Sequence, residues 1–529
     1  MTSHSSQLRF PQRSVVSSFI FVKTEGESKV ALFKRSGKVS TYRYHLAPIS
    51  GNIEPHETPT NAAWRELREE TSLTLQDLDF WREGKPYSFS DPSVGRQWTI
   101  YPFSFQLKGC DEGGRGENGI QIDWEHESWA WHDPKSIRDS EDFGGVPRLK
   151  ESLRRVWFEG DMSEGASEAL IRGLKQLRTD HTSGSNELTV LALKAYHDVI
   201  TLMKGEINTT WWDTARMVAW HLWKNGRPSM GAATLNALLA LLAEMQETLT
   251  GSLDREIEWE TLHAACHHHI HRRKAISKRI QTSFAAYLKS NFVPIVNSRS
   301  KTSLAILTLS ASSTIRDSLV DAFASIHVPR LELRILESRP LYEGVRMASS
   351  IVSAFQTRFP CTSERELQIT IYTDASAALA SQNLDFVLLG ADQISDCGSV
   401  SNKTGSLPAV LSAKQISPKS KVLIITALEK VAGSTVDDYH SHEANDPKEV
   451  MNSWLACGVT EFNTLNDGAK TAHHDQHHYM FEVKNIYFEW VPAEAVDAYV
   501  CEEGTLNLAG IKEKAKEVNN KIERFFGDL

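Results

Sequence analysis

Apolar and polar positions alternate in short runs over the first part of this chain, as they do in β-strands. The run VVSSFIFV at 15–22 predicts a buried strand, and residues 30–34 predict its partner. Residues 98–107 and 122–131 are rich in aromatic and β-branched side chains, which strands favour. The polar, glycine-rich stretch at 110–119 predicts a solvated loop between them. This region is therefore expected to be a mixed α+β domain.

The spacing of apolar residues changes twice further along the chain. Residues 163–290 carry leucine, alanine and valine at helical spacing, which predicts a helical region. Beyond residue 303, near-continuous apolar runs alternate with helix-length segments, which indicates a parallel, doubly wound sheet. These predicted strands lie at 304–309, 331–336, 367–373, 386–390 and 421–427. The polar segment 431–480 predicts a long excursion from the sheet.

The three patterns give the expected domain organisation, because 529 residues are too many for one hydrophobic core. We expect an α+β domain at 14–140 and a linker at 141–164. A helical part at 165–295 and a doubly wound α/β part at 296–529 are expected to follow.

Composition and charge argue against several classes of protein. The formal net charge of −9 gives no basic surface for a nucleic-acid backbone. No apolar run reaches the roughly 18 residues that span a bilayer, and the polar segment 1–13 lacks the apolar core of a secretory signal. The six cysteines have no paired short spacing, as expected of reduced thiols. The sequence therefore predicts a cytoplasmic protein with neither nucleic acid nor membrane as partner.

A helix with three carboxylates on one face is the first candidate for chemistry. Thr58 and Pro59 predict its start, since threonine caps a first turn and proline suits the first helical position. Glu66, Glu69 and Glu70 follow at i, i+3 and i+4 spacing, which brings them to one face. Grouped like charges call for a cation, and carboxylate oxygens suit Mg²⁺ or Mn²⁺. The sequence predicts a divalent metal site on this helix.

The segment from Gly51 to Leu73 resembles the Nudix box, in which Gly, then Glu, then Arg-Glu-x-x-Glu-Glu occur at these separations. The resemblance covers roughly residues 14–140. It implies a mixed sheet between helices, and a hydrolase that cleaves the diphosphate of a nucleoside diphosphate-linked substrate. The groups that it implies as metal ligands are the carbonyl of Gly51 and the carboxylates of Glu66, Glu69 and Glu70.

The resemblance also assigns supporting residues. Arg65 would orient the carboxylates through ion pairs, and Glu57 would support that arrangement. A further acidic residue from the following strands often joins such a site, and Glu127, then Glu125, are the candidates. The chain departs from the box at two positions, with Ser72 and Asn52 in place of glycines. Ser72 puts the turn after the helix in question, because glycine tolerates a left-handed backbone there.

The C-terminal region carries residues suited to a phosphorylated sugar. Arg227, Arg339 and Lys403 are candidate cationic donors to phosphate groups. Asn402 and Lys403 stand where a strand or turn enters a helix, and a helix N-terminus favours an anion. Asp392 follows the apolar run FVLLG, which would place it at the carboxyl edge of the sheet, where ligands bind in such folds.

Seven phrases in this region together resemble the translation initiation factor 2B family. They are SGSNEL (183–188), GRPSMGAATLNAL (226–238), AILTLSASST (305–314), ESRPLYEG (337–344), TDASAAL (373–379), GADQISDCGSVSNKTGS (390–406) and FEWVPAEAVDAYVCEEG (488–504). The family includes regulatory subunits of the exchange factor, methylthioribose-1-phosphate isomerase and ribose-1,5-bisphosphate isomerase. The resemblance covers about 165–529 and implies a helical part followed by a Rossmann-like part.

By resemblance to the isomerases, Asp392 matches the catalytic aspartate, whereas Ser310 stands where their cysteine should be. A hydroxyl is harder to ionise than a thiol, and no histidine lies nearby in the motif. Three interpretations follow: binding of a sugar or nucleotide phosphate without isomerisation, an active isomerase, or a structural and oligomeric role.

The leading hypothesis is a Nudix hydrolase fused to this second domain. A Nudix domain that cleaved ADP-ribose or a related nucleotide sugar would release a ribose phosphate, which relatives of the second domain handle. The alternatives are a metabolite sensor, or a translation factor subunit that docks with homologous subunits. Family members commonly dimerise through the C-terminal fold, so a homodimer is expected.

Overall fold

The computed structural model describes residues 10–24, 27–181, 183–203, 205, 207–251, 255–294, 301–360, 362–433, 445–462 and 481–529. The chain divides into two compact units. One comprises residues 1–178 and 195–226 with Leu529, and the other comprises 179–194 and 227–528. No helix in the described ranges is both long and apolar enough to cross a membrane.

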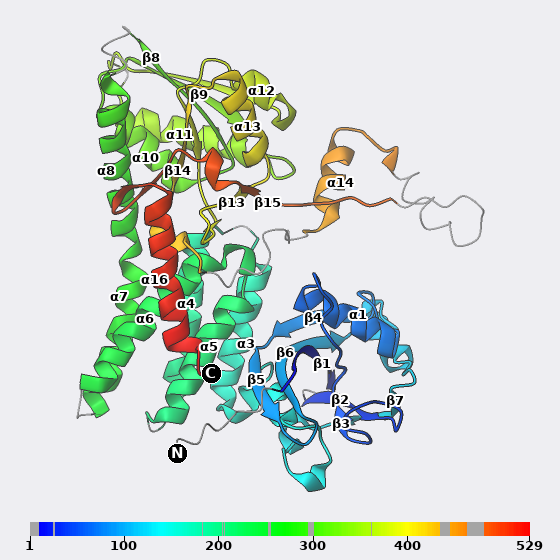
Figure 1. Cartoon of the computed structure of the whole chain (residues 1–529). Coiled ribbons are helices and arrows are strands. Elements are labelled where there is room, and N and C mark those ends of the chain that lie inside the picture. The colour runs from blue at the N-terminus through cyan, green and yellow to red at the C-terminus, as the bar shows by residue number, and fades with distance from the viewer. Residues whose placement is uncertain are drawn as a thin grey trace, which may run out of the picture. The chain divides into compact units, whose positions relative to one another are not determined.

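The N-terminal part is built on a seven-stranded mixed sheet (Figure 1). Its elements are β1 (Gln12–Thr24), β2 (Glu27–Arg35), β3 (Leu46–Ala47), α1 (Pro59–Thr71), β4 (Leu78–Glu83), β5 (Tyr87–Asp91), β6 (Arg96–Leu107), β7 (His126–His132) and α2 (Leu149–Arg154). The strand order is β3-β2-β1-β6-β4, with β5 also paired to β6 and β7 to β2. Strands β1 and β6 are parallel, and the other pairs are antiparallel.

Two apolar clusters cover the faces of this sheet. One packs Ala62, Ala63 and Leu67 of α1 against strand residues such as Phe105. The other packs Leu149 and Leu153 of α2 against the opposite face. The predicted strands at 15–22, 30–34 and 98–107 are confirmed within β1, β2 and β6. The strand predicted from residue 122 begins only at His126, because a turn occupies residues 124 and 125.

The chain between residues 164 and 291 is helical, as its periodicity predicts. The helices are α3 (Glu164–Thr179), α4 (Ser185–Leu202), α5 (Thr209–Lys224), α6 (Gly231–Gly251), α7 (Arg255–His271) and α8 (Arg273–Asn291). The two compact units divide these helices between them.

The C-terminal part alternates strands and helices. Its elements are β8 (Ser303–Leu309), α10 (Ser313–Ala324), β9 (Arg330–Leu336), α11 (Glu343–Arg358), β10 (Glu366–Tyr372), α12 (Ala377–Ala380), β11 (Phe386–Leu389), β12 (Gln393–Ile394), β13 (Val400–Lys403), α13 (Ser406–Ile416), β14 (Lys421–Ile425), α14 (Pro447–Ala456), β15 (Phe488–Val491), β16 (Ala498–Cys501), β17 (Gly504–Leu506) and α16 (Leu508–Phe526). The predicted excursion at 431–480 falls largely outside the described residues, apart from α14 and its neighbours.

Seven of these strands form one sheet in the order β10-β9-β8-β11-β14-β16-β17. All neighbouring pairs are parallel except β16 and β17. Strand β8 is mostly apolar because alternate residues enter two different cores. Leu304 and Ile306 pack with α8, α10 and α11, whereas Leu307 and Leu309 pack with α13 and α16. Strands β12, β13 and β15 form a separate three-stranded sheet.

Candidate active site

Helix α1 holds the carboxylates of the predicted metal site. The Thr58 hydroxyl accepts a hydrogen bond from the Asn61 amide (3.2 Å), which confirms the predicted cap. Glu66 and Glu70 are buried on the face that packs toward the sheet. Glu69 points away, with 54% of its side chain exposed.

Gly51 lies directly against one of these carboxylates. A Cβ added at Gly51 would overlap the carboxyl group of Glu66, so only glycine lets the backbone come this close. The Gly51 carbonyl also accepts a hydrogen bond from the Val16 amide (2.9 Å), which fixes its position beside β1. The glycine of the box is therefore required by close approach rather than by its backbone angles.

Arg65 organises the acidic residues around it. Its guanidinium donates two hydrogen bonds of 2.9 Å to Glu57, one of 2.7 Å to Glu66 and one of 3.2 Å to Glu69. A fifth hydrogen bond reaches the carbonyl of Asn52 (2.9 Å). The Arg65 hydrogen bonds hold the pKa of Glu57 below its usual range. This is the orienting arrangement that the sequence predicts for Arg65 and Glu57.

The turn after α1 forms although serine replaces glycine. Ser72 adopts the left-handed conformation (φ 60°) and its amide closes the helix on the Arg68 carbonyl (3.0 Å). The Ser72 carbonyl in turn accepts a hydrogen bond of 2.6 Å from Arg115. Arg115 is itself held by Asp77 through contacts of 2.8 and 2.7 Å. An arginine–aspartate clamp thus holds the turn in place.

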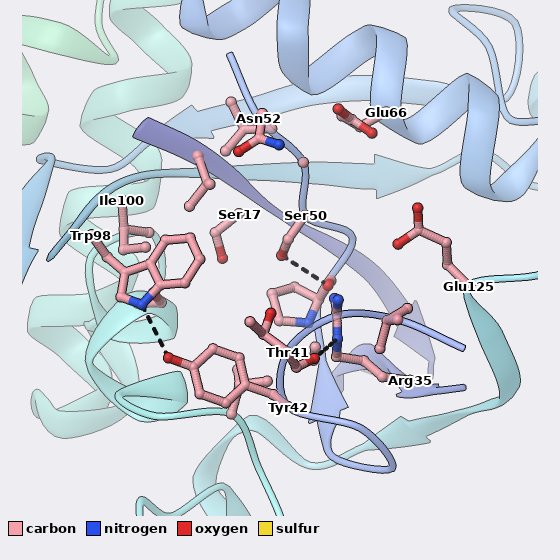
Figure 2. Close-up of a pocket in the computed structure, with 18 of the residues that line it drawn as sticks. Ser17, Arg35, Thr41, Tyr42, Ser50, Asn52, Glu66, Trp98, Ile100 and Glu125 are labelled. Carbon is pink, nitrogen blue, oxygen red and sulfur yellow. Dashed lines mark hydrogen bonds between the residues drawn. The ribbon is translucent and has the colours of Figure 1, made fainter. Parts of the chain in front are cut away.

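The structure distinguishes the two candidates for the additional acidic residue. Glu125 lies in the turn before β7 and lines a cavity together with Glu66 and Glu70 (Figure 2). Glu127 lies on β7, pairs with Lys34 (3.3 Å), and is not among the residues that line the cavity. The turn directs Glu125 inward, so Glu125 is the better placed of the two.

His126 is a site residue that the sequence analysis did not identify. Its Nε2 lies 2.6 Å from a carboxylate oxygen of Glu70, and its side chain is fully buried. Burial first, and then the charge of Arg35, lower the pKa of His126 to about 4. When Glu70 is ionised, as it would be with a cation bound, its oxygens can only accept, and the neutral ring would then donate from Nε2. His126 thereby fixes the orientation of Glu70.

The electrostatics of the cluster favour a bound cation. Burial and the nearby charges of Glu125 and Glu66 raise the pKa of Glu70 well above its ordinary value. Burial likewise raises the pKa of Glu66 and of Glu125. Buried oxygen ligands with few partners suit a hard divalent ion such as Mg²⁺ or Mn²⁺. The residues present therefore fit such a metal.

The cavity extends from these carboxylates along the sheet and measures about 450 Å³. Arg35 lines it next to the acidic end, with its Nε donating to the carbonyl of Thr41 (3.3 Å). Tyr42 and Trp98 line the opposite end, as Figure 2 shows. The cavity thus has an acidic end, the positively charged side chain of Arg35 beside it, and an aromatic wall formed by Tyr42 and Trp98.

A second group of functional side chains gathers in the C-terminal part. Ser310 follows β8 with a left-handed backbone (φ 62°), and its hydroxyl donates to the carboxylate of Glu343 (2.7 Å). The other carboxylate oxygen of Glu343 pairs with Lys403 (3.3 Å), whose ammonium also lies over the Tyr487 ring. The Ser310 amide donates to the Ser338 hydroxyl (2.8 Å). Glu343 therefore bridges the predicted serine and the predicted lysine.

Asp392 lies close enough to Lys403 and Glu343 for their charges to act on its carboxyl group. Burial raises the pKa of its carboxyl, and the cations Lys430, Lys403 and Arg227 act against that rise. The structure thus brings together Ser310, Asp392, Lys403 and Arg227, as the sequence predicts.

The remaining two predicted phosphate ligands are engaged locally. Asn402 donates to the Ser406 hydroxyl (2.9 Å) at the start of α13. Arg339 pairs with Glu337 (2.9 Å) and lies over the ring of Tyr342.

Family comparisons agree with both halves of this arrangement. Residues 181–508, more than half of the chain, match the initiation factor 2 subunit family. The chain belongs to the initiation factor 2 subunit family. Residues 12–156 match the NUDIX domain, which supports a hydrolase acting on pyrophosphate bonds. No curated protein matches the chain.

Several solved structures resemble this chain at low sequence identity. Translation initiation factor eIF-2B from Pyrococcus horikoshii OT3 has a TM-score of 0.44 at 16% identity, over 64% of this chain and 97% of that one. A chain of the eIF2B-beta2-delta2 complex from C. thermophilum has a TM-score of 0.46 at 10% identity, and the match covers 68% of this chain and 98% of that one. The 5-methylthioribose 1-phosphate isomerase from Pyrococcus horikoshii OT3 has a TM-score of 0.42 at 16% identity, and the match covers 66% of this chain and 87% of that one.

Proposed function

We propose that the Nudix domain is a metal-dependent hydrolase that cleaves the diphosphate of a nucleoside diphosphate-linked substrate, with an ADP-ribose-like compound as the first candidate. One observation carries the proposal: Glu66, Glu70 and Glu125 converge on one end of a cavity that also holds Arg35. A diphosphate needs both a metal and a positive side chain, and these groups would provide them.

Each residue has a defined part in this proposal. Glu66, Glu70, Glu125 and the Gly51 carbonyl would hold Mg²⁺ or Mn²⁺, which supplies activation of water and neutralisation of phosphate charge when bound. Arg65 and His126 act through these ligands by orienting their carboxylates. Arg35 would bind the phosphoryl group further from the metal. Glu69 is exposed and paired with Arg65, so it would contribute from the rim.

The proposal is tested with purified protein, Mg²⁺ and a panel of nucleoside diphosphate derivatives, analysed for phosphate-ester products. We expect Glu70→Gln to reduce turnover by at least 100-fold, because it removes a metal ligand. Glu127→Gln is the matched control, since it changes a neighbouring carboxylate outside the cavity. Absence of turnover throughout the panel, or equal rates for Glu70→Gln and wild type, would refute the proposal.

For the C-terminal domain we propose binding of a sugar phosphate or nucleotide phosphate. The supporting observation is the group of Ser310, Asp392, Lys403 and Arg227 at the end of β8 and β11. In a Rossmann-like sheet, ligands bind at this carboxyl edge. Calorimetry with ribose-1,5-bisphosphate and with AMP tests the proposal. Binding without product supports a sensor, whereas aldose-to-ketose conversion supports an isomerase.

We also propose a cytoplasmic homodimer formed through the C-terminal domain. Light scattering on the full chain tests the oligomer. Co-purification with exchange-factor subunits would instead support the translation-factor alternative.

A further inference from the structure

Helix α7 carries a histidine among the buried residues of its sequence, and it packs against α6 (Figure 1). Leu262, Ala265, Cys266 and His269 recur at helical spacing and are all buried. The first three side chains suit a hydrophobic core. The imidazole of His269 does not, because a buried polar group needs a polar partner. The nature of that partner therefore decides what His269 does.

The partner is Glu244 of α6. The Nε2 atom of His269 lies 2.9 Å from the Oε2 atom of the Glu244 carboxylate. The Nδ1 atom of His268 lies 3.6 Å from the same oxygen. Neighbouring residues of a helix point about 100° apart, yet these two imidazole rings have centroids only 5.4 Å apart. One ligand atom from each of the three residues lies within 4.8 Å of the other two.

The separations between these atoms fit a metal site better than a pair of hydrogen bonds. A separation of 3.6 Å is too long for a hydrogen bond, so such a bond does not explain the contact of His268 with Glu244. In a tetrahedral zinc site with bonds of about 2.0–2.1 Å, two ligand atoms lie about 3.3 Å apart. The separations of 2.9 and 3.6 Å lie on either side of this value. Small side-chain movements would therefore let the three groups bind one ion.

The types of ligand favour a particular class of metal. Imidazole nitrogen suits zinc and similar transition ions, whereas Mg²⁺ prefers oxygen ligands. Two histidines and one glutamate are a set of ligands that zinc accepts, with water in the fourth position. The group is partly open to solvent, since 60% of the His268 side chain and 39% of the Glu244 side chain are exposed. An ion can therefore reach these residues from solvent and keep a water ligand.

We propose that Glu244, His268 and His269 form a zinc site that links α6 to α7. All three residues belong to the second compact unit, so this site is distinct from the carboxylates of the Nudix domain. The proposal does not depend on the proposed hydrolase, because it needs neither a nucleotide nor turnover. Zinc would connect two helices of this unit, so bound zinc should stabilise the unit against unfolding.

Two other histidines of α7 provide the main competing interpretation. His267 and His271 are exposed and lie one turn apart, with stacked rings whose centroids are 6.4 Å apart. Two histidines at i and i+4 of a helix can also bind zinc. In that case, zinc binding would depend on His267 and His271, and Glu244 would only accept a hydrogen bond from His269.

Calorimetry with Zn²⁺ tests the site on the full chain without a histidine tag, in excess Mg²⁺ that occupies oxygen-rich sites. We expect wild type to bind one zinc ion that Mg²⁺ does not displace. We expect His269→Gln to weaken this binding at least tenfold. Glutamine can still donate a hydrogen bond to Glu244, so the variant keeps a link between the helices and loses only the imidazole ligand. Glu244→Gln removes the carboxylate and should weaken binding to a similar extent.

The double variant His267→Gln/His271→Gln is the matched control, because it removes two histidines from the same helix and leaves the proposed ligands intact. We expect its affinity for zinc to stay within twofold of wild type. Zinc should also raise the unfolding temperature of wild type and of the double variant, but not that of His269→Gln.

Equal zinc affinity of wild type and His269→Gln would overturn the proposal. Loss of binding in the double variant alone would also overturn it and would assign the ion to His267 and His271. Absence of zinc binding to wild type in excess Mg²⁺ would overturn it as well. The proposed hydrolase fails by a different result, the absence of turnover in wild type.

Discussion

Ser72 shows how a single residue of the Nudix box can depart from glycine. Its left-handed backbone is unfavourable for a residue with a Cβ, and the carbonyl contact from Arg115 helps to hold it there. We expect Ser72→Gly to stabilise the Nudix domain by about 1 kcal/mol, because it relieves this strain. Thermal unfolding measures the effect. Ser72→Ala keeps the strain and should leave the unfolding temperature nearly unchanged; an equal gain for both would contradict the explanation.

Asp77 anchors the same turn through a buried carboxylate. It accepts hydrogen bonds from the Arg115 side chain, the Thr74 amide and the Thr74 hydroxyl. The Arg115 contact is the main reason that the pKa of Asp77 is lowered. We expect Asp77→Asn to destabilise the domain by about 2 kcal/mol, since Arg115 and the amides lose their charged partner.

The pH dependence of this effect has a defined sign. A carboxyl with a lowered folded pKa stabilises the fold above its unfolded pKa of about 3.9. That stability is lost as the pH falls from about 4 toward the folded pKa. Denaturant unfolding of wild type and Asp77→Asn should therefore differ at pH 7 and converge in acid. A constant difference between pH 7 and pH 3 would contradict this account.

At the scale of the element, α1 depends on its first turn to present the proposed metal ligands. The Thr58 cap is expected to contribute about 1 kcal/mol, so Thr58→Ala should lower stability by that amount. Thr60→Ala is the matched control, because Thr60 is an exposed residue of the same turn without a capping role. Alanine has the higher helix propensity, so Thr60→Ala should not lower stability, and an equal loss in both variants would contradict the capping explanation. Urea unfolding distinguishes the two.

The elements also show what the sequence could predict. The spacing of Glu66 and Glu70 on one helix predicts the acidic site, whereas Glu69, expected on the same face, points away from it. The orienting role of Arg65 was expected from the resemblance to the Nudix box. The central parallel strands β8, β11 and β14 were equally clear, because burial on both faces makes their sequences mostly apolar.

Other site residues depend on contacts that spacing does not contain. The choice between Glu125 and Glu127 depends on a turn at 124–125 inside a segment that otherwise resembles a strand. His126 lies between these candidates, and only its contact with Glu70 of α1 shows its role. The aromatic wall joins Tyr42 to Trp98 across 56 positions, which no local pattern predicts. Glu343 stands in the phrase ESRPLYEG, but its bridge to Ser310 and Lys403 requires the fold.

At the scale of the whole molecule, the two candidate sites belong to different compact units. We expect Asp392→Asn to leave nucleotide hydrolysis within twofold of wild type. Glu70→Gln should in turn leave sugar-phosphate binding within twofold. Product analysis and calorimetry on the full chain measure these effects. A change in one site caused by the variant in the other would show energetic coupling between the units.

The position of Glu343 has a consequence for what the C-terminal domain can detect. An anion that binds Lys403 must displace a carboxylate that is already paired with it. The free energy gained on binding is then the difference between the ligand–Lys403 and the Glu343–Lys403 interaction energies, which is small for a ligand with one negative charge. A doubly charged phosphate gains more, so we expect this group of side chains to bind phosphate in preference to chloride and simple carboxylic acids. Glu343 would thus compete with anionic ligands for Lys403, so that only ligands with more than one negative charge bind there well.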